Sequence, residues 1–183
     1  KSASKRFIFV TSAGNNMSEW RFVDANVPDS GLTLVQPRRE DFEYDVDHHG
    51  ERFLIRNNGN GARDFKVSET PVSAPGSENW KDFVPHLPGR PIAGFSVSQD
   101  YFVLYYRANG LPQVQIMDLS TGVTHDLSLD EEDYSVRLQG SREWDSPILR
   151  FSYASLTTPA TVYDYDMGTR QREFRKQVQV LGD

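Results

Sequence analysis

The sequence lacks cysteine and any long run of apolar residues. Its 183 residues contain no cysteine, which excludes disulfide bonds, thiol catalysis and a cysteine-ligated zinc site. No segment approaches the roughly 18 consecutive apolar residues of a membrane-spanning helix, so we expect no membrane partner. The chain begins at Lys1 without a methionine or a signal-peptide pattern, which suggests a segment of a longer protein.

Positive charge is in deficit. The chain carries 20 Lys and Arg residues against 26 Asp and Glu residues, which gives a net charge of −6 and a pI near 5.2. Phosphate-binding surfaces are usually basic, so this balance argues against nucleic acid as a partner. An acidic cavity or a cationic ligand suits the composition better.

The motifs of a hydrolase site are also missing. A nucleophilic serine of that class lies in a tight G-x-S-x-G turn, and no such motif occurs. Ser141 follows Gly140 but lacks the second glycine, so we interpret it as part of a loop. The four histidines lie in predicted turns or within a strand, where we interpret them as solvated turn or surface side chains rather than bases or metal ligands: His48, His49, His86 and His125.

Two further segments resemble ligand-binding loops but lack features that such loops require. Residues 130–133 form an acidic run without the alternating ligands and central glycine of a calcium loop, so we predict a solvated loop. Residues 57–64 are rich in glycine, but no helix follows them, so we predict a hairpin turn rather than a phosphate-binding loop. We therefore expect no metal site and no cofactor.

Short runs of Val, Ile, Phe, Tyr and Leu, separated by Gly, Pro, Asn, Asp and Ser, dominate the sequence and predict an all-β fold. Two series of such runs repeat along the chain. The first series begins at Arg6, Arg52, Tyr101 and Leu149, at intervals of 46, 49 and 48 residues. The second series begins at Trp20, Phe65, Val114 and Thr161, at intervals of 45, 49 and 47 residues.

A period of this length, with four strands in each repeat, matches a β-propeller blade. We predict about four blades, at residues 1–37, 42–86, 92–129 and 134–178, of which the first lacks its innermost strand. A β-sandwich is the alternative, but that fold does not require a constant period. Because four blades is near the lower limit of known rings, we expect a partial ring of a larger propeller.

Five segments carry a family resemblance. They are "TSAGNNMSEWRFVDA" (11–25), "EYDVDHHGERFLIRNN" (43–58), "RANGLPQVQIMDL" (107–119), "SLTTPATVYDYDM" (155–167) and "VLGD" (180–183). Together they resemble the propeller of the oligopeptidase B branch of the prolyl oligopeptidase family of serine peptidases. The resemblance covers essentially the whole chain.

This resemblance implies the second half of a seven-bladed propeller, in a cytoplasmic protein whose α/β-hydrolase catalytic domain follows Asp183. It implies that the propeller is noncatalytic, covers the active site, and restricts access to short peptides cleaved after Arg or Lys. Two alternatives stay open at this point. One is an independent propeller that binds a peptide, sugar or protein partner, and the other is a propeller glycosidase, for which no acidic pair can be singled out.

Three acids form the candidate site. In the predicted strand 42–48, Glu43, Asp45 and Asp47 alternate with Phe42, Tyr44 and Val46, so the two sets lie on opposite faces. Innermost strands border the central channel of a propeller, and three carboxylates there give it a negative potential. In a relative of oligopeptidase B this potential favours cationic peptides. The alternative is that the acids face solvent or pair with arginines at 52, 56 or 63.

The ends of the partial ring predict association. The first predicted blade carries Phe7, Ile8, Phe9 and Val10, and the last carries Ile148, Leu149, Phe151 and Tyr153. Repeat proteins usually cover such ends with polar residues, and exposed apolar faces favour association. We therefore expect the chain alone to form a homo-oligomer, such as two copies that complete a ring of about eight blades.

Overall fold

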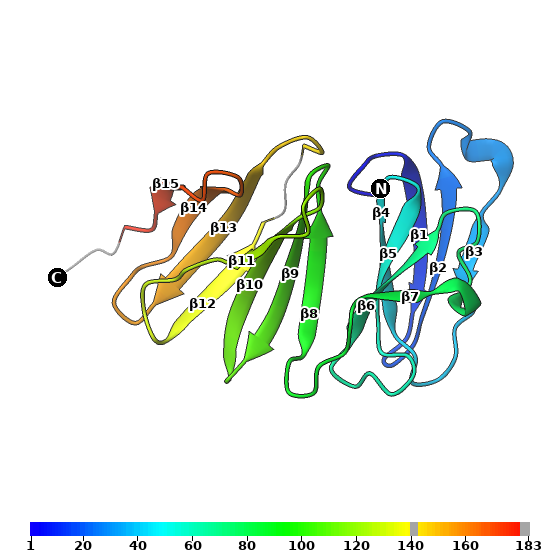
Figure 1. Cartoon of the computed structure of the whole chain (residues 1–183), viewed down its shortest axis with the longest axis horizontal. Helices are drawn as coiled ribbons and strands as arrows, with labels where there is room; N and C mark the ends of the chain where they lie inside the picture. The colour runs from blue at the N-terminus through cyan, green and yellow to red at the C-terminus, as the bar shows by residue number, and fades with distance from the viewer. Residues whose placement is uncertain (140–142, 180–183) are drawn as a thin grey trace. The chain divides into compact units, whose positions relative to one another are not determined.

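The computed structural model describes residues 1–139 and 143–179 (Figure 1). Strands dominate these residues, and the helical elements are two single 3-10 turns, η1 (Pro28–Ser30) and η2 (Ser77–Asn79). The all-β prediction is confirmed. No helix among the described residues is long and apolar enough to cross a membrane.

Four antiparallel sheets follow one another along the described chain. The first has three strands, β1 (Phe7–Ala13), β2 (Ser18–Asp24) and β3 (Thr33–Gln36). The second contains β4 (Tyr44–His49), β5 (Arg52–Asn57), β6 (Lys66–Pro71) and β7 (Lys81–Val84). The third contains β8 (Ile92–Val97), β9 (Tyr101–Ala108), β10 (Leu111–Asp118) and β11 (Thr124–Asp126). The fourth contains β12 (Tyr134–Leu138), β13 (Ile148–Ser155), β14 (Thr161–Asp166) and β15 (Arg172–Gln177).

In every sheet the strands are neighbours in chain order, which is the meander expected when each polar turn connects two adjacent apolar runs. The prediction that the first repeat has one strand fewer than the others is confirmed. Ser2 and Phe7 exchange hydrogen bonds at the start of β1. The amide of Ser2 donates to the carbonyl of Phe7 at 2.8 Å, and the amide of Phe7 donates to Oγ of Ser2 at 3.0 Å.

The chain divides into two compact units, Lys1–Val97 and Ser98–Asp183. An aromatic cluster forms the core of the first unit. Phe53 is fully buried, and the centre of its ring lies 4.8 Å from that of Phe22 and 5.4 Å from that of Phe7. Such edge-to-face pairs stabilise a core by about 0.5–1.5 kcal/mol beyond the burial of their area.

The core of the second unit corrects one prediction. Leu149, Phe151 and Tyr153 were predicted on an exposed end face, but they are buried together with Val103 and Ile116. Side chains alternate along β13, so Arg150 lies on the opposite face and is exposed. The alternation shows which residues share a face, but not which of the two faces the neighbouring sheet covers.

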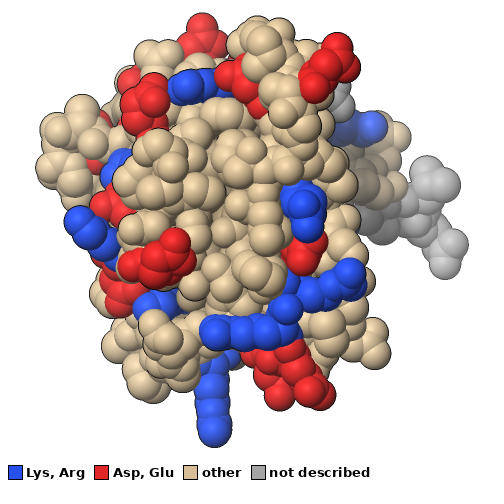
Figure 2. Space-filling view, turned by 90° about the vertical axis from the view of Figure 1, so that its right-hand side faces the viewer, with Lys and Arg blue, Asp and Glu red and all other residues tan. Residues whose placement is uncertain are grey.

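The first sheet keeps an exposed apolar surface. Phe7 is buried, contrary to the prediction, whereas Val10 is exposed as predicted. Val27 and Leu32, in the connection between β2 and β3, are exposed as well. Figure 2 shows the side of the molecule on which β2 and β3 lie in Figure 1. Uncharged residues cover the centre of this view, and the charged residues visible in it lie mainly around them.

Candidate functional site

Strand β4 carries the predicted acidic face. Tyr44, Val46 and His48 are buried, while Asp45 and Asp47 between them are partly exposed. The predicted alternation is therefore confirmed. A two-residue turn, Gly50 and Glu51, leads into β5, and the φ of +62° at Gly50 lies in the left-handed region that favours glycine.

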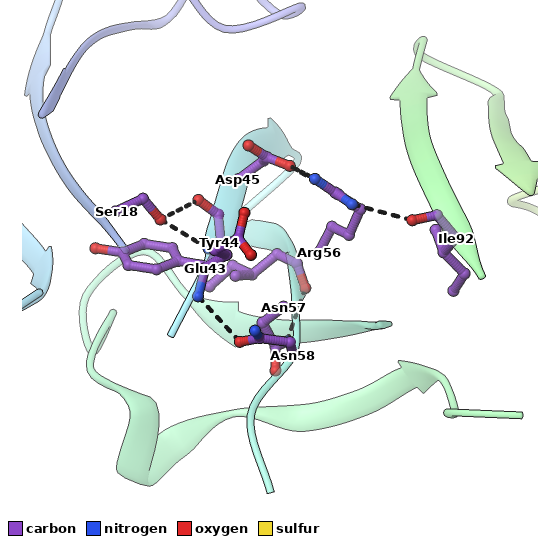
Figure 3. A network of polar contacts seen from close by, with 9 residues as sticks. Ser18, Glu43, Tyr44, Asp45, Arg56, Asn57, Asn58 and Ile92 are labelled. Carbon is purple, nitrogen blue, oxygen red and sulfur yellow. Dashed lines mark hydrogen bonds and ion pairs between the residues drawn. The ribbon is translucent and has the colours of Figure 1, made fainter. Parts of the chain in front are cut away.

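Asp45 is neutralised by Arg56 on the neighbouring strand. The two residues are direct partners in the β4–β5 register, and Nη2 and Nε of Arg56 lie 2.6 and 2.7 Å from one carboxylate oxygen of Asp45 (Figure 3). The Arg56 side chain is 17% exposed and that of Asp45 is 49% exposed. This acid follows the alternative interpretation, in which the carboxylate pairs with a cross-strand arginine.

Arg56 has two further partners. Its Nη1 donates a 3.0 Å hydrogen bond to the carbonyl of Ile92 at the start of β8, and its guanidinium lies 4.2 Å from the ring centre of Phe65. Figure 3 shows the side chain reaching from β5 to both Asp45 and Ile92. Arg56 thereby connects β5 with the neighbouring strand β4 and with the chain that enters β8.

Asp47 anchors the segment that precedes β1. Its Oδ1 accepts hydrogen bonds of 2.8 Å from the amide of Ala3 and from the amide of His48. Burial raises the pKa of the Asp47 carboxyl, against the lowering effect of these two amides. Its carboxylate therefore holds the main chain in place.

His48 was predicted to be a solvated surface residue, and this is wrong. Its side chain is 2% exposed, Nδ1 lies 2.7 Å from Oγ of Ser4, and its ring packs edge to face on Phe7 at 4.7 Å. Burial lowers the pKa of His48. The signal was present in the sequence, because position 48 shares its strand face with Tyr44 and Val46.

Glu43 differs from the other two acids. Its amide donates to Oδ1 of Asn58 at 3.0 Å, and its carbonyl accepts from the amide of Asn58 at 3.2 Å, which extends the β4–β5 ladder by one residue. Its carboxylate has no hydrogen-bond or ion-pair partner within residues 1–139 and 143–179. Of the three candidate acids, only Glu43 offers an unpaired charge.

Tyr44 is a structural residue that the sequence analysis did not single out. Its hydroxyl accepts from the amide of Trp20 at 2.8 Å and donates to the carbonyl of Gln36. Ser18 accepts from the amide of Tyr44 at 2.7 Å and donates to its carbonyl at 2.8 Å (Figure 3). Burial raises the pKa of Tyr44 to about 12, so the hydroxyl stays protonated and fixes β4 against β2 and β3.

The remaining candidates also have structural roles. Residues 130–133 lie in a loop, and Asp130, Glu132 and Asp133 are exposed there as predicted. Asp130 also pairs with Arg172 at 2.6 Å, and Glu131 binds two threonines. Residues 58–65 connect β5 to β6 without a helix, as expected of a turn. Ser141 lies outside the described residues. No group of three or more His, Asp or Glu residues within the described ranges is arranged to hold a metal ion.

A buried carboxylate lies in the last sheet. Asp164 on β14 is 5% exposed and pairs with Arg150 on β13 and with Arg175 on β15. Arg150 binds both carboxylate oxygens, at 2.6 and 2.8 Å, and Arg175 binds one at 2.7 Å. The Arg150 guanidinium, joined by Arg175, lowers the pKa of Asp164 to about 2. This cluster joins three strands.

Comparison with known proteins identifies similar chains over the full length. The family model "Prolyl oligopeptidase, N-terminal beta-propeller domain" matches residues 1–178. Dipeptidyl aminopeptidase BI of Pseudoxanthomonas mexicana is 34% identical over 182 residues, which are 100% of this chain and 25% of that protein. Protease 2 of Moraxella lacunata is 30% identical over 183 residues, 100% of this chain and 26% of that protein.

Two solved structures of oligopeptidase B have similar folds. The Leishmania major protein has a TM-score of 0.90 at 27% identity, covering 100% of this chain and 27% of that chain. The Trypanosoma brucei protein, in a closed form with covalently bound antipain, has a TM-score of 0.90 at 25% identity, covering 98% of this chain and 27% of that chain. The chain therefore spans about a quarter of the length of the curated relatives it matches.

Proposed function

Because the chain belongs to the prolyl oligopeptidase family, as part of its N-terminal β-propeller domain, we propose that it is the noncatalytic cover of a serine oligopeptidase. The observation that carries this proposal is the match of residues 1–178 to the propeller alone. The described residues agree with it, because their polar clusters have structural roles. Ser4 binds Nδ1 of a His48 that is buried against Phe7, and Arg150 joins its strand to Asp164 on the next.

We further propose that residues 1–37, 42–86, 92–129 and 134–178 are successive blades of a seven-bladed ring. The four sheets, each a meander in chain order, support this division. An α/β-hydrolase domain then follows Asp183 and supplies the nucleophile, the base and the oxyanion donors. The length of the relatives, about four times that of this chain, leaves room for such a domain.

The proposed role of the propeller is to admit short peptides and exclude folded proteins. A cover needs a defined shape and contacts with the catalytic domain, and it needs no reactive side chain. The description of the Trypanosoma brucei relative as a closed form supports a cover that opens and closes in that protein. Enclosure of the substrate also removes water from the reacting groups.

We propose that the substrates are cleaved after Arg or Lys and that Glu43 helps to attract them. The net charge of −6 and the unpaired carboxylate of Glu43 support a cationic substrate. Asp45 contributes less because Arg56 neutralises it, and Asp47 contributes less because it holds the Ala3 amide.

The test is hydrolysis of matched short peptides with Arg, Lys or a neutral residue before the cleaved bond. Full-length protein is expected to cleave the Arg and Lys peptides and to lose activity with a serine-directed covalent inhibitor, while residues 1–183 alone show no turnover. One relative is named a dipeptidyl aminopeptidase, so the products are also checked for dipeptide release. Turnover by residues 1–183 that survives the inhibitor would overturn the proposal.

A further inference from the structure

The turn between β13 and β14 exposes a large apolar side chain. Leu156 is 94% exposed, whereas the other exposed large hydrophobic residues, such as Phe174 at 57% and Val123 at 56%, keep part of their surface covered. A single exposed leucine is common on protein surfaces. Leu156 differs from such a residue in the fixed turn that holds it and in the groups that lie beside it.

The turn that carries Leu156 is fixed by hydrogen bonds. Oγ of Ser155 accepts from the amides of Thr157 and Thr158 at 3.1 and 2.9 Å. The hydroxyls of the same two threonines donate to the Glu131 carboxylate at 2.6 and 2.7 Å. Hydrogen bonds from Ser155, Thr157 and Thr158 lower the pKa of Glu131 to about 2, so the carboxylate stays charged and bound at neutral pH.

The chain leaves the last sheet at this same turn. β13 and β15 both pair antiparallel with β14, so they run in the same direction and end at the same edge of the sheet. The amide of Val178, just after β15, donates to the carbonyl of Ala160 in the turn at 2.9 Å. Val178 is itself 55% exposed. Whatever follows β15 in the protein therefore starts beside the turn that carries Leu156.

Two unpaired acids lie near the turn that carries Leu156, because Tyr134, which directly follows them, pairs with Ser155. Glu132 and Asp133 directly follow Glu131, are exposed, and make no ion pair or side-chain hydrogen bond within residues 1–139 and 143–179. We call Leu156, Val178, Glu132 and Asp133 the exit patch. An apolar centre beside two negative charges fits an apolar pocket with Lys or Arg at its rim.

We propose that the exit patch docks on the catalytic domain that follows in the same polypeptide, with Leu156 in an apolar pocket rimmed by basic residues. This inference rests on the proposed function. Three features favour this occupant over a separate protein. The chain exits at the patch, which gives the following domain a high effective concentration there. The relatives are about four times longer than this chain. The turn is already ordered, so docking costs little conformational entropy.

The first test measures the accessibility of position 156 in full-length protein. Leu156→Cys and the control Val123→Cys each place a thiol in an exposed turn of the same unit, and this chain has no other cysteine. Maleimide labelling is followed by peptide mass spectrometry. The thiol at position 156 is expected to react about tenfold more slowly than the control, because labelling then requires the domains to separate. Equal rates in a folded protein would overturn the proposal.

A second variant provides an independent readout. Leu156→Asp places a charge in the proposed pocket, and it is expected to increase the radius of gyration of the full-length protein in small-angle X-ray scattering. Val123→Asp is expected to leave the radius unchanged. The two readouts must agree, so protection at position 156 without an effect of Leu156→Asp also counts against the docking.

The hydrolysis assay separates this inference from the proposed function. If the wild-type protein cleaves Arg and Lys peptides but position 156 is accessible, the docking is wrong and the proposed function stands. Wild-type protein without peptidase activity rejects the proposed function, and a protected position 156 would then mark contact with a domain of another kind.

Discussion

Arg56 joins the carboxylate of Asp45 on β4 to the carbonyl of Ile92 at the start of β8. The Arg56 side chain thus pairs with a carboxylate of β4, the proposed channel strand. It also fixes the chain where β8, the first strand of the third sheet, begins. Its guanidinium also lies over the ring of Phe65. This arrangement leaves Asp45 without an unpaired charge.

Arg56→Ala is expected to lower the free energy of unfolding by about 1–3 kcal/mol, because it removes a charged hydrogen bond to a carbonyl and leaves Asp45 unpaired. Urea denaturation of the variant and the wild type measures the change. Arg63→Ala is the control, since Arg63 is exposed and its side chain makes no hydrogen bond between strands in the part of the chain that the structure describes. Equal stability of the two variants would show that Arg56 does not connect the strands energetically.

Glu43→Gln in the full-length protein is expected to reduce kcat/KM for cationic peptides about two- to fivefold at low salt, and less at high salt, where screening is stronger. Asp45→Asn is the matched comparison and is expected to have a smaller effect, because Arg56 already neutralises Asp45. The measurement is kcat/KM against ionic strength for both variants. An unchanged kcat/KM for Glu43→Gln at low salt would leave Glu43 as an ordinary surface charge.

The lowered pKa of Asp164 predicts that the folded protein loses stability in acid. Its pKa is lowered from 3.8 to about 2 in the folded protein, so its contribution is fully present above the unfolded pKa. That contribution is lost as the pH falls from about 4 through about 2. We expect it to be about 1 kcal/mol, because both arginine partners are about half exposed and solvent screens the pairs. Chemical denaturation at several pH values measures the loss.

Asp164→Asn serves as the control for this pH dependence. The variant keeps the shape of the side chain but has no titrating carboxyl, so its stability is expected to change less between pH 4 and pH 2, a range set by the unfolded and folded pKa values. Identical pH profiles for the variant and the wild type would assign the acid sensitivity to other carboxylates.

Residues 1–183 alone are expected to self-associate through the first sheet, where Val10, Val27 and Leu32 are exposed. The exposed face of the last sheet carries the Arg150, Asp164 and Arg175 cluster, so we expect it to contribute less. Light scattering over a dilution series measures the association, and Val10→Lys combined with Leu32→Lys is expected to weaken it. A stable monomer at micromolar concentration would contradict this prediction.

The strands and their faces were predictable because apolar alternation is a local signal. Tyr44, Val46 and His48 occupy the same face in the sequence pattern and in the structure. The pairing of Asp45 with Arg56 could also be predicted from the sequence. A two-residue turn at Gly50 and Glu51 fixes the hairpin register and places these residues opposite each other.

Other features depend on contacts between distant segments and were not predictable. The anchoring of Asp47 depends on Ala3, which lies 44 residues away in the sequence. The burial of Leu149 and Phe151 depends on which face of β13 meets Val103 and Ile116. A period-2 pattern shows which side chains share a face, but not which distant segment covers that face.

The central claim, that this chain covers the active site of an oligopeptidase, is tested most directly by the dependence of cleavage on substrate size. One cleavable sequence containing Arg is placed in a short peptide and in an exposed loop of a folded protein. Full-length protein is expected to cleave the peptide and leave the folded protein intact, because the propeller excludes it. Cleavage of both at similar kcat/KM would contradict the account.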